Sequence, residues 1–138
     1  MKELKEILFG VNIDSVYGDT NVSISKISFD SRNLKQNSLF VAIQGYKLDG
    51  HDYINQSINN GAIVVVCETL PKNINEYNIL FIKVKCSKTA LYTISSNFYE
   101  NPSSKIDLIG VTGTNGKTTI TSLLYNLFND LGIKSGLI

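Results

Sequence analysis

A glycine-rich segment late in the sequence holds the residues whose types and spacing are best suited to chemistry. It reads Thr-Gly-Thr-Asn-Gly-Lys-Thr-Thr over residues 112–119. A mainly apolar run at 106–111 precedes it, and apolar residues at helical spacing follow it over 120–131. Strand, glycine turn and helix in this order predict a phosphate-binding loop, because the glycines let the backbone approach an anion that the first amides of the helix then face.

We expect the residues of this loop to divide the work of binding ATP and Mg²⁺. Lys117 is the predicted catalytic residue, since its mobile ammonium can reach the β- and γ-phosphates, and the Thr118 hydroxyl is the predicted metal ligand. Thr119 either contacts a phosphate or only helps to start the helix. The full set of predicted ATP-binding residues is Gly113, Thr114, Asn115, Gly116, Lys117, Thr118 and Thr119.

The match to the general phosphate-loop pattern is incomplete, because Val111 stands where that pattern has its first glycine. The loop expected here is therefore shorter than usual. The alternative interpretation is a glycine-rich turn between strand and helix that carries an exposed lysine and binds nothing. We favour the phosphate loop because strand, glycines, lysine, hydroxyl and helix all occur in the required order.

Composition excludes several classes of protein. The chain has 138 residues, of which 43% are hydrophobic and 18% charged, so a buried core is expected. A net charge of +1 without a Lys/Arg stripe argues against nucleic acid as a partner. The longest fully apolar run, 62–67, is too short to insert into a membrane, and the N-terminus does not resemble a signal peptide. We therefore expect a cytoplasmic protein in which Cys67 and Cys86 are buried free thiols.

The hydrophobic pattern predicts an α/β fold with a small mixed sheet. Strands are expected at 39–43, 62–67 and 79–82, with an extended segment at 22–27. Helices are expected at 3–9, 52–60 and 87–98. Asp52 is the predicted N-cap of the middle helix, and Gly61 the residue that ends it. The unbroken apolar run at 62–67 is typical of a parallel strand covered on both faces.

A cluster of helix- and strand-breaking residues at 101–104 is the predicted boundary between two domains. We expect residues 1–100 to form an N-terminal domain, 101–104 a linker, and 105–138 the beginning of a second domain. That second part offers one strand, the loop, one helix and the start of another strand at 136–138, which is too little to cover the helix. The sequence therefore predicts the N-terminal part of a longer protein.

Several short segments in this order and spacing resemble the beginning of a Mur ligase. The segments are Phe29-Asp-Ser-Arg32, Leu39-Phe-Val-Ala-Ile43, Asp49-Gly-His51, Gly61-Ala62, Phe98-Tyr99 with Asn101-Pro-Ser103, and the loop from Gly110 to Thr119. The resemblance covers nearly the whole chain. Only the phosphate loop is specific as a single motif; for the other segments it is their order and spacing together that are specific.

The resemblance implies an ATP-dependent amide-bond ligase of peptidoglycan synthesis, of the branch that adds the third amino acid to UDP-MurNAc-L-Ala-D-Glu. The partners it implies are that UDP-linked dipeptide and an amino acid, either meso-diaminopimelate or L-lysine. A related branch that adds D-alanyl-D-alanine is the alternative within the family. A non-catalytic module that binds a nucleotide sugar is the alternative outside it, and we expect the 138 residues alone to be inactive.

The resemblance also implies which residues hold the UDP end of the substrate. They are Phe29, Ser31, Tyr46, Lys47 and Leu48. An aromatic face against uracil, with a hydroxyl and backbone amides at its edge, suits such a ligand. Ser31 has the alternative of capping a turn.

Two neighbours of these residues have simpler explanations. Arg32 is expected to pair with Asp30 or Asp49 at the surface. His51 is the single histidine of the chain and is expected to serve as a cap or a packing residue.

Overall fold

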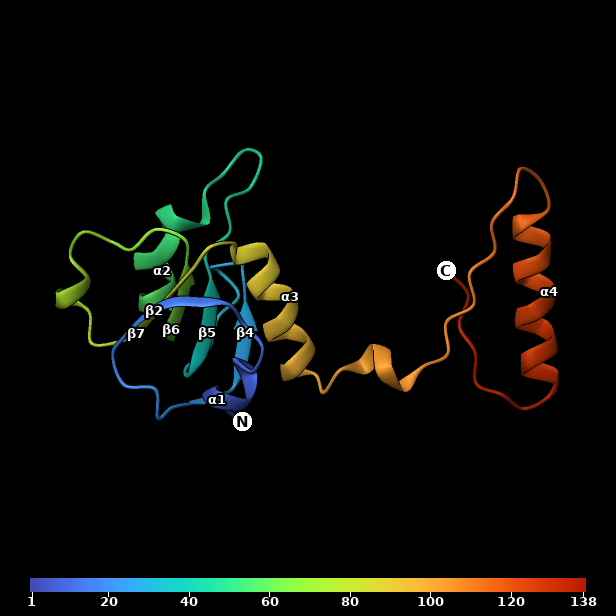
Figure 1. The fold of residues 1–138 in the computed structure, drawn as a ribbon, viewed down its shortest axis with the longest axis horizontal. Coiled ribbons are helices and arrows are strands. Elements are labelled where there is room, and N and C mark those ends of the chain that lie inside the picture. The colour runs from blue at the N-terminus through green and yellow to red at the C-terminus, as the bar shows by residue number, and fades with distance from the viewer. The chain divides into compact units, whose positions relative to one another are not determined.

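A computed structural model describes residues 1–138, which form two compact units, Met1–Ser103 and Ser104–Ile138 (Figure 1). The first unit contains every strand of the structure, and the second contains one long helix. The division falls within the residues expected to form the linker. What each unit binds does not follow from the division itself.

The first unit is built on a five-stranded mixed sheet. Strands β4 to β7 run parallel to their neighbours, and β2 joins the edge antiparallel to β7. The order across the sheet is β2 (Ile13–Tyr17), β7 (Leu80–Val84), β6 (Ala62–Cys67), β5 (Ser38–Val41) and β4 (Lys26–Ser28). This arrangement confirms the predicted α/β fold with a mixed sheet. A separate antiparallel pair joins β1 (Lys2–Glu3) to β3 (Ser23–Ile24).

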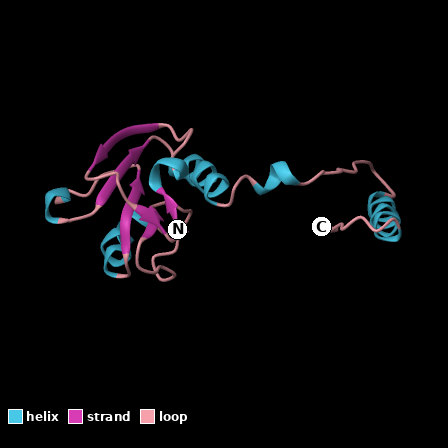
Figure 2. Cartoon of the chain, turned by 90° about the horizontal axis from the view of Figure 1, so that it is seen from below, coloured by secondary structure: helices cyan, strands magenta, loops and turns pink.

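The central strand β6 is apolar throughout because both of its faces are buried. Val64 and Val66 belong to one hydrophobic cluster, and Val65 and Cys67 to a second. Because successive side chains of a strand point to opposite faces, the two clusters lie on the two faces of the sheet. Helices α1 and α3 contribute to the first cluster and α2 to the second, so helices flank the strands in Figure 2.

The helices of the first unit are short. Their bounds are α1 (Leu4–Ile7), α2 (Ile54–Asn59) and α3 (Ser87–Phe98), with 3₁₀ turns η1 (Gly50–Tyr53) and η2 (Ile74–Glu76). A third 3₁₀ turn, η3 (Pro102–Lys105), includes the boundary between the two units. The predicted cap at Asp52 is wrong. The η1 turn starts the helical segment at Gly50, so the capping position moves upstream to Asp49, whose carboxylate accepts a hydrogen bond from the His51 amide at 2.9 Å.

Strand β2 is the main element that the sequence did not predict. Its five residues read Ile-Asp-Ser-Val-Tyr, which does not alternate between apolar and polar, and four of the five are exposed. An edge strand of this kind is held by ladder hydrogen bonds to β7 more than by burial, so hydrophobic pattern carries little information about it.

The second unit consists of α4 (Lys117–Asp130) and the extended segments on either side of it. The strands expected at 106–111 and 136–138 are not formed. A strand is defined by ladder hydrogen bonds to a neighbour, and this unit holds no other strand to supply them. The apolar residues of α4 are accordingly unburied, with Leu123 63% and Leu127 51% exposed.

The two cysteines differ in environment, and both are free thiols. Cys67 is buried as predicted, and burial raises the pKa of its thiol to about 11. The prediction for Cys86 is wrong, because this residue follows the end of β7 and precedes α3 at the surface.

None of the helices combines the length and the apolar character that a bilayer-spanning segment requires.

Gly61 offers a test of the close approach between the turn after α2 and the backbone before β5. Its φ of +102° is disfavoured for residues with a side chain, and an added Cβ would lie 2.8 Å from the carbonyl carbon and oxygen of Lys35. A strained backbone conformation of this kind costs roughly 1–3 kcal/mol. We expect Gly61→Ala to lower the free energy of unfolding of the chain by at least this amount, as measured by urea denaturation. Gly136→Ala is the control, because its Cβ meets nothing within 4 Å and its φ is ordinary. Equal stability of the two variants would contradict this account of Gly61.

Candidate functional site

The glycine loop of the second unit has a backbone with two positive φ angles that leads directly into an uncapped helix. Gly116 is the N-cap of α4 with a φ of +81°, and Gly113 has a φ of +154°. No side chain caps the helix, so the amides of its first turn keep their hydrogen-bonding capacity for another partner. An added Cβ at Gly116 would meet open space, so the glycine is needed for its left-handed conformation.

Lys117 folds back over this loop. Its Nζ donates hydrogen bonds to the carbonyl oxygens of Gly113 at 2.6 Å and Thr114 at 3.4 Å. The ammonium is thereby held beside the glycine turn, and the side chains of Thr114, Asn115, Thr118 and Thr119 are exposed around it. Free helix amides with a nearby ammonium fit a phosphate group.

The fit to Mg²⁺ rests on Thr118 alone. No cluster of three or more His, Cys, Asp or Glu side chains that could hold a metal ion occurs among the 138 residues. Mg²⁺ commonly keeps several water molecules and binds one or two protein oxygens together with phosphate oxygens. The exposed Thr118 hydroxyl at the start of α4 is compatible with that mode of binding.

The residues predicted to hold the UDP end lie in loops at one edge of the first unit's sheet. Phe29 and Ser31 follow β4, and residues 46–48 follow β5, which runs parallel to β4. Phe29 is 65% exposed and Leu48 66%, while Tyr46 is fully exposed. The carboxyl edge of parallel strands is the usual ligand side of an α/β sheet. The topology therefore brings the two loops to the same edge, with apolar surface available.

The loop after β5 is a tight hairpin. The Gly50 amide donates to the Ile43 carbonyl at 2.9 Å, and Gln44 and Asp49 form a bridge above it. The Gly45 amide then donates to the Leu48 carbonyl at 2.9 Å. An added Cβ at Gly50 would lie 2.6 Å from the Ile43 nitrogen, so the closure of the hairpin requires glycine there. Residues 46–48 are thus presented at its tip.

Ser31 is bound to α2 in a way that the sequence analysis missed. The side chain is buried, and its Oγ donates to Oε1 of Gln56 at 2.9 Å. The Asn60 side-chain amide donates to the Ser31 carbonyl at 2.8 Å. The available signal was the pair of amide side chains four residues apart, which share one helix face. The Ser31 hydroxyl is therefore fixed in position and retains lone pairs that can accept a hydrogen bond.

Arg32 pairs with Asp30, the first of its two expected partners. The guanidinium donates two hydrogen bonds to the carboxylate, at 3.0 and 2.9 Å. These hydrogen bonds lower the pKa of Asp30 to about 2. Both side chains are exposed, so the pair contributes little to stability.

His51 forms a bridge between the base of the hairpin and the end of β6, as expected for a structural rather than a catalytic histidine. Its Nδ1 lies 2.6 Å from the Asp49 carboxylate. Its Nε2 accepts from the backbone amides of Glu68 at 3.0 Å and Thr69 at 3.4 Å. Since an accepting nitrogen carries no proton, the proton resides on Nδ1. The hydrogen bonds from the backbone amide and then the side chain of His51 hold the pKa of Asp49 below its usual value.

Glu68 continues this network to α3. Its carboxylate accepts from the Ser87 hydroxyl at 2.6 Å and from the Ser87 amide at 2.8 Å. These two bonds, the hydroxyl first, lower the pKa of Glu68. Glu68 thus supplies the cap that Cys86, the N-cap residue of α3, does not provide.

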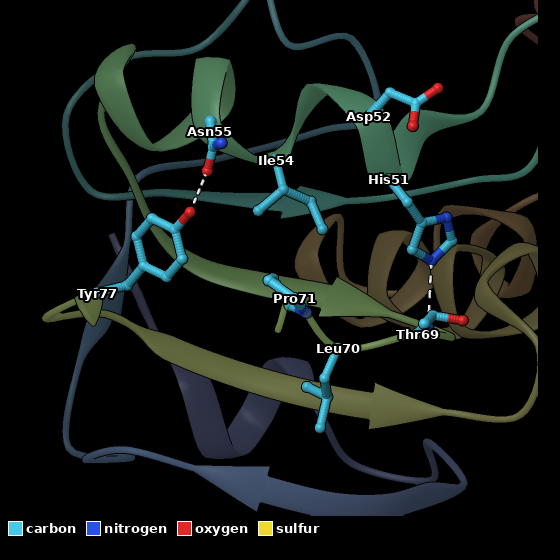
Figure 3. A pocket seen from close by; sticks show the side chains of 8 residues that line it. All are labelled: His51, Asp52, Ile54, Asn55, Thr69, Leu70, Pro71 and Tyr77. Carbon is cyan, nitrogen blue, oxygen red and sulfur yellow. Dashed lines mark hydrogen bonds between the residues drawn. The ribbon is translucent and has the colours of Figure 1, made fainter. Parts of the chain in front are cut away.

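A cavity of about 180 Å³ lies between η1, α2 and the segment after β6 (Figure 3). Its lining residues are His51, Asp52, Ile54, Asn55, Thr69, Leu70, Pro71 and Tyr77. None of the residues predicted to hold the UDP end belongs to this set. Small-molecule sites usually measure about 300–1,000 Å³, so the cavity is too small for a nucleotide. It does not account for the predicted binding of UDP.

The chain therefore combines an α/β unit, whose loops lie at the carboxyl edge of its sheet, with a candidate phosphate loop at the start of a helix. The model of the Mur ligase family, catalytic domain, matches residues 23–99, which is more than half of the chain. The chain belongs to the Mur ligase family. The matched residues lie in the first unit and do not include the glycine loop.

Sequence relatives agree with this membership, and solved structures show a similar fold. The chain is 48% identical over 136 residues to the UDP-N-acetylmuramoyl-L-alanyl-D-glutamate--2,6-diaminopimelate ligase of Cytophaga hutchinsonii, covering 99% of this chain and 28% of that protein. The solved UDP-N-acetylmuramoylalanyl-D-glutamyl-2,6-diaminopimelate--D-alanyl-D-alanyl ligase of Acinetobacter baumannii has a similar fold, with a TM-score of 0.66 at 23% identity over 94% of this chain and 28% of that one.

A further solved structure contains a bound nucleotide. The MurF ligase of Thermotoga maritima, in complex with ADP, matches with a TM-score of 0.52 at 28% identity over 76% of this chain and 23% of that one. The chain thus spans less than a third of the length of each of these proteins.

The Glu68 cap gives a pH-dependent prediction. Because the folded-state pKa of Glu68 is lowered, its carboxylate stabilises the fold above the unfolded-state pKa, and this contribution is lost as pH falls through the folded-state pKa. We expect Glu68→Gln to be less stable than the unmodified chain at neutral pH, with a difference that shrinks in acid. Urea denaturation from pH 7 to pH 3 measures it, with Glu6→Gln as the exposed control. A difference that stays constant over this range would contradict the role of the charge.

Proposed function

We propose that the full-length protein containing this chain is an ATP-dependent ligase that joins 2,6-diaminopimelate to UDP-N-acetylmuramoyl-L-alanyl-D-glutamate. One observation carries the proposal: in a Mur ligase chain, a glycine turn holds Lys117 beside uncapped amides at the start of a 14-residue helix. The 48% identity to a ligase named for this reaction supports the choice of amino acid.

The proposed reaction requires two negatively charged groups to meet. The side-chain carboxylate of the D-glutamate residue attacks the γ-phosphate of ATP and releases ADP, and the amine of the incoming amino acid then displaces phosphate from the resulting acyl phosphate. Lys117 and the α4 amides would neutralise and align the triphosphate, since positioning and charge stabilisation dominate phosphoryl transfer. Mg²⁺, held by Thr118 and phosphate oxygens, would supply further positive charge.

The first unit would hold the far end of the UDP-linked substrate. The exposed rings of Phe29 and Tyr46 offer faces for uracil, and the fixed Ser31 hydroxyl offers an acceptor at its edge. Lys47 and the backbone of the hairpin tip would meet the diphosphate. We assign the reaction to the cytoplasm because it consumes ATP.

The decisive experiment offers the purified full-length protein the UDP-linked dipeptide or tripeptide together with diaminopimelate, L-lysine or D-alanyl-D-alanine. We expect phosphate release and product with the dipeptide and diaminopimelate. Lys117→Ala should reduce ligation at least a hundredfold, because the charge on the triphosphate is lost, while the Kd for the UDP substrate stays within about twofold. Turnover only with the tripeptide and D-alanyl-D-alanine would assign the protein to the other branch.

Substitution of Ser31 tests the UDP end separately. Ser31→Ala removes the hydroxyl and leaves Gln56 without its partner, so we expect the KM for the UDP substrate to rise about 3- to 10-fold with kcat nearly unchanged. The exposed Ser103→Ala is the matched control. Steady-state kinetics with each substrate varied measures both, and a loss confined to kcat would rule out a role in binding uridine.

A further inference from the structure

The hairpin at 43–50 presents its tip to solvent but is tied to itself. The three contacts that close it join Ile43 to Gly50, Gln44 to Asp49 and Gly45 to Leu48. None of these contacts fixes the direction in which the tip points relative to the neighbouring strands. A loop that contributes binding energy must be held in its bound conformation, or ordering it reduces the affinity.

His51 supplies a link from this hairpin to a neighbouring strand. Through Nδ1 it holds Asp49, which closes the hairpin, and through Nε2 it holds the amides after β6. The imidazole is largely enclosed, with 16% of its side chain exposed, so water competes weakly for these bonds. Figure 3 shows the His51 ring, which extends from η1, with Nε2 directed at Thr69.

The two arms of the bridge need different chemistry. The Asp49 carboxylate accepts a hydrogen bond from Nδ1–H, and the Glu68 backbone amide after β6 donates a hydrogen bond to Nε2. A neutral imidazole offers one donor and one acceptor at opposite sides of a rigid ring, which fits both demands at once. Asparagine can reproduce only the hydrogen bond to Asp49, because its amide group reaches the position of Nδ1. Glutamine can reproduce only the hydrogen bond from the amides after β6, because its amide group reaches the position of Nε2.

We propose that His51 is a positioning residue that fastens the 43–50 hairpin to the end of β6 and thereby sets the affinity for the UDP end of the substrate. This inference rests on the proposed binding role of residues 46–48. His51 touches no substrate in this account and acts through Asp49 and the Glu68 amide.

The test measures hairpin order and substrate affinity in the same full-length variants. Hydrogen–deuterium exchange reports the amides of residues 43–50, and titration calorimetry reports the Kd of the UDP-linked dipeptide. For His51→Ala we expect faster exchange in the hairpin, unchanged exchange in 62–67, and a Kd raised roughly tenfold, about the effect of losing a well-placed hydrogen bond. The KM for ATP and kcat should change less than about twofold.

Conservative variants separate the bridge from a general structural effect. His51→Asn and His51→Gln each keep one arm, so both should fall between the unmodified protein and His51→Ala. Asp49→Asn keeps an acceptor oxygen for the ring and should restore most of the affinity lost in Asp49→Ala. Asp52→Asn, which changes a neighbouring charge outside the bridge, is the control.

Two outcomes would overturn the inference, and they differ in what they imply. Unchanged exchange in the hairpin of His51→Ala, Asn and Gln would show that the bridge does not order it, whatever the protein binds. Faster exchange with an unchanged Kd would show that the hairpin is ordered by His51 but does not hold the UDP end, which would also remove residues 46–48 from the proposed site. Ligase activity in the assay above is independent of both outcomes.

Discussion

The parallel pairing of β5 with β6 is the constraint on which the rest of the first unit depends. Parallel strands end at the same edge, so the hairpin after β5 and the Glu68 segment after β6 become neighbours. His51 can then reach the Glu68 amide, and the Glu68 carboxylate can reach the first residue of α3. An antiparallel pairing of β5 with β6 would place these two segments at opposite ends of the sheet and remove the contact between His51 and Glu68. The contact between Glu68 and Ser87 depends in the same way on the parallel pairing of β6 with β7.

Polar contacts at this edge form a continuous series from the hairpin to α3. Hydrogen bonds join Asp49 to His51, His51 to Glu68, and Glu68 to Ser87. No buried side-chain nitrogen or oxygen lacks a hydrogen-bond partner. These hydrogen bonds hold the backbone of the loops at this edge of the sheet and do not cover the exposed side chains of the hairpin tip. Tyr46 stays exposed at the tip of the hairpin that Asp49 helps to close.

The two units carry the residues predicted to bind ligands in different ways. In the second unit, backbone amides and one ammonium converge on a short glycine turn, so few side chains are needed. In the first, exposed rings and a fixed hydroxyl are spread over loops from separate strands. The glycine turn of the second unit suits a compact, highly charged phosphate chain. The exposed rings and fixed hydroxyl of the first unit suit a flat base with hydrogen-bonding edges.

Sequence alone determined the elements that follow from local physical chemistry. The apolar run at 62–67 became the doubly covered strand β6, Gly61 ended α2, and α4 began directly after the glycine turn. Tertiary structure decided what depends on distant neighbours. The exposure of Cys86, the antiparallel edge strand β2, and the contacts of Ser31 with Gln56 and Asn60 came from packing and strand order. Local pattern reports which face of an element is apolar, but a hydrogen-bond partner some 25 residues away is chosen only when the sheet brings the two segments together.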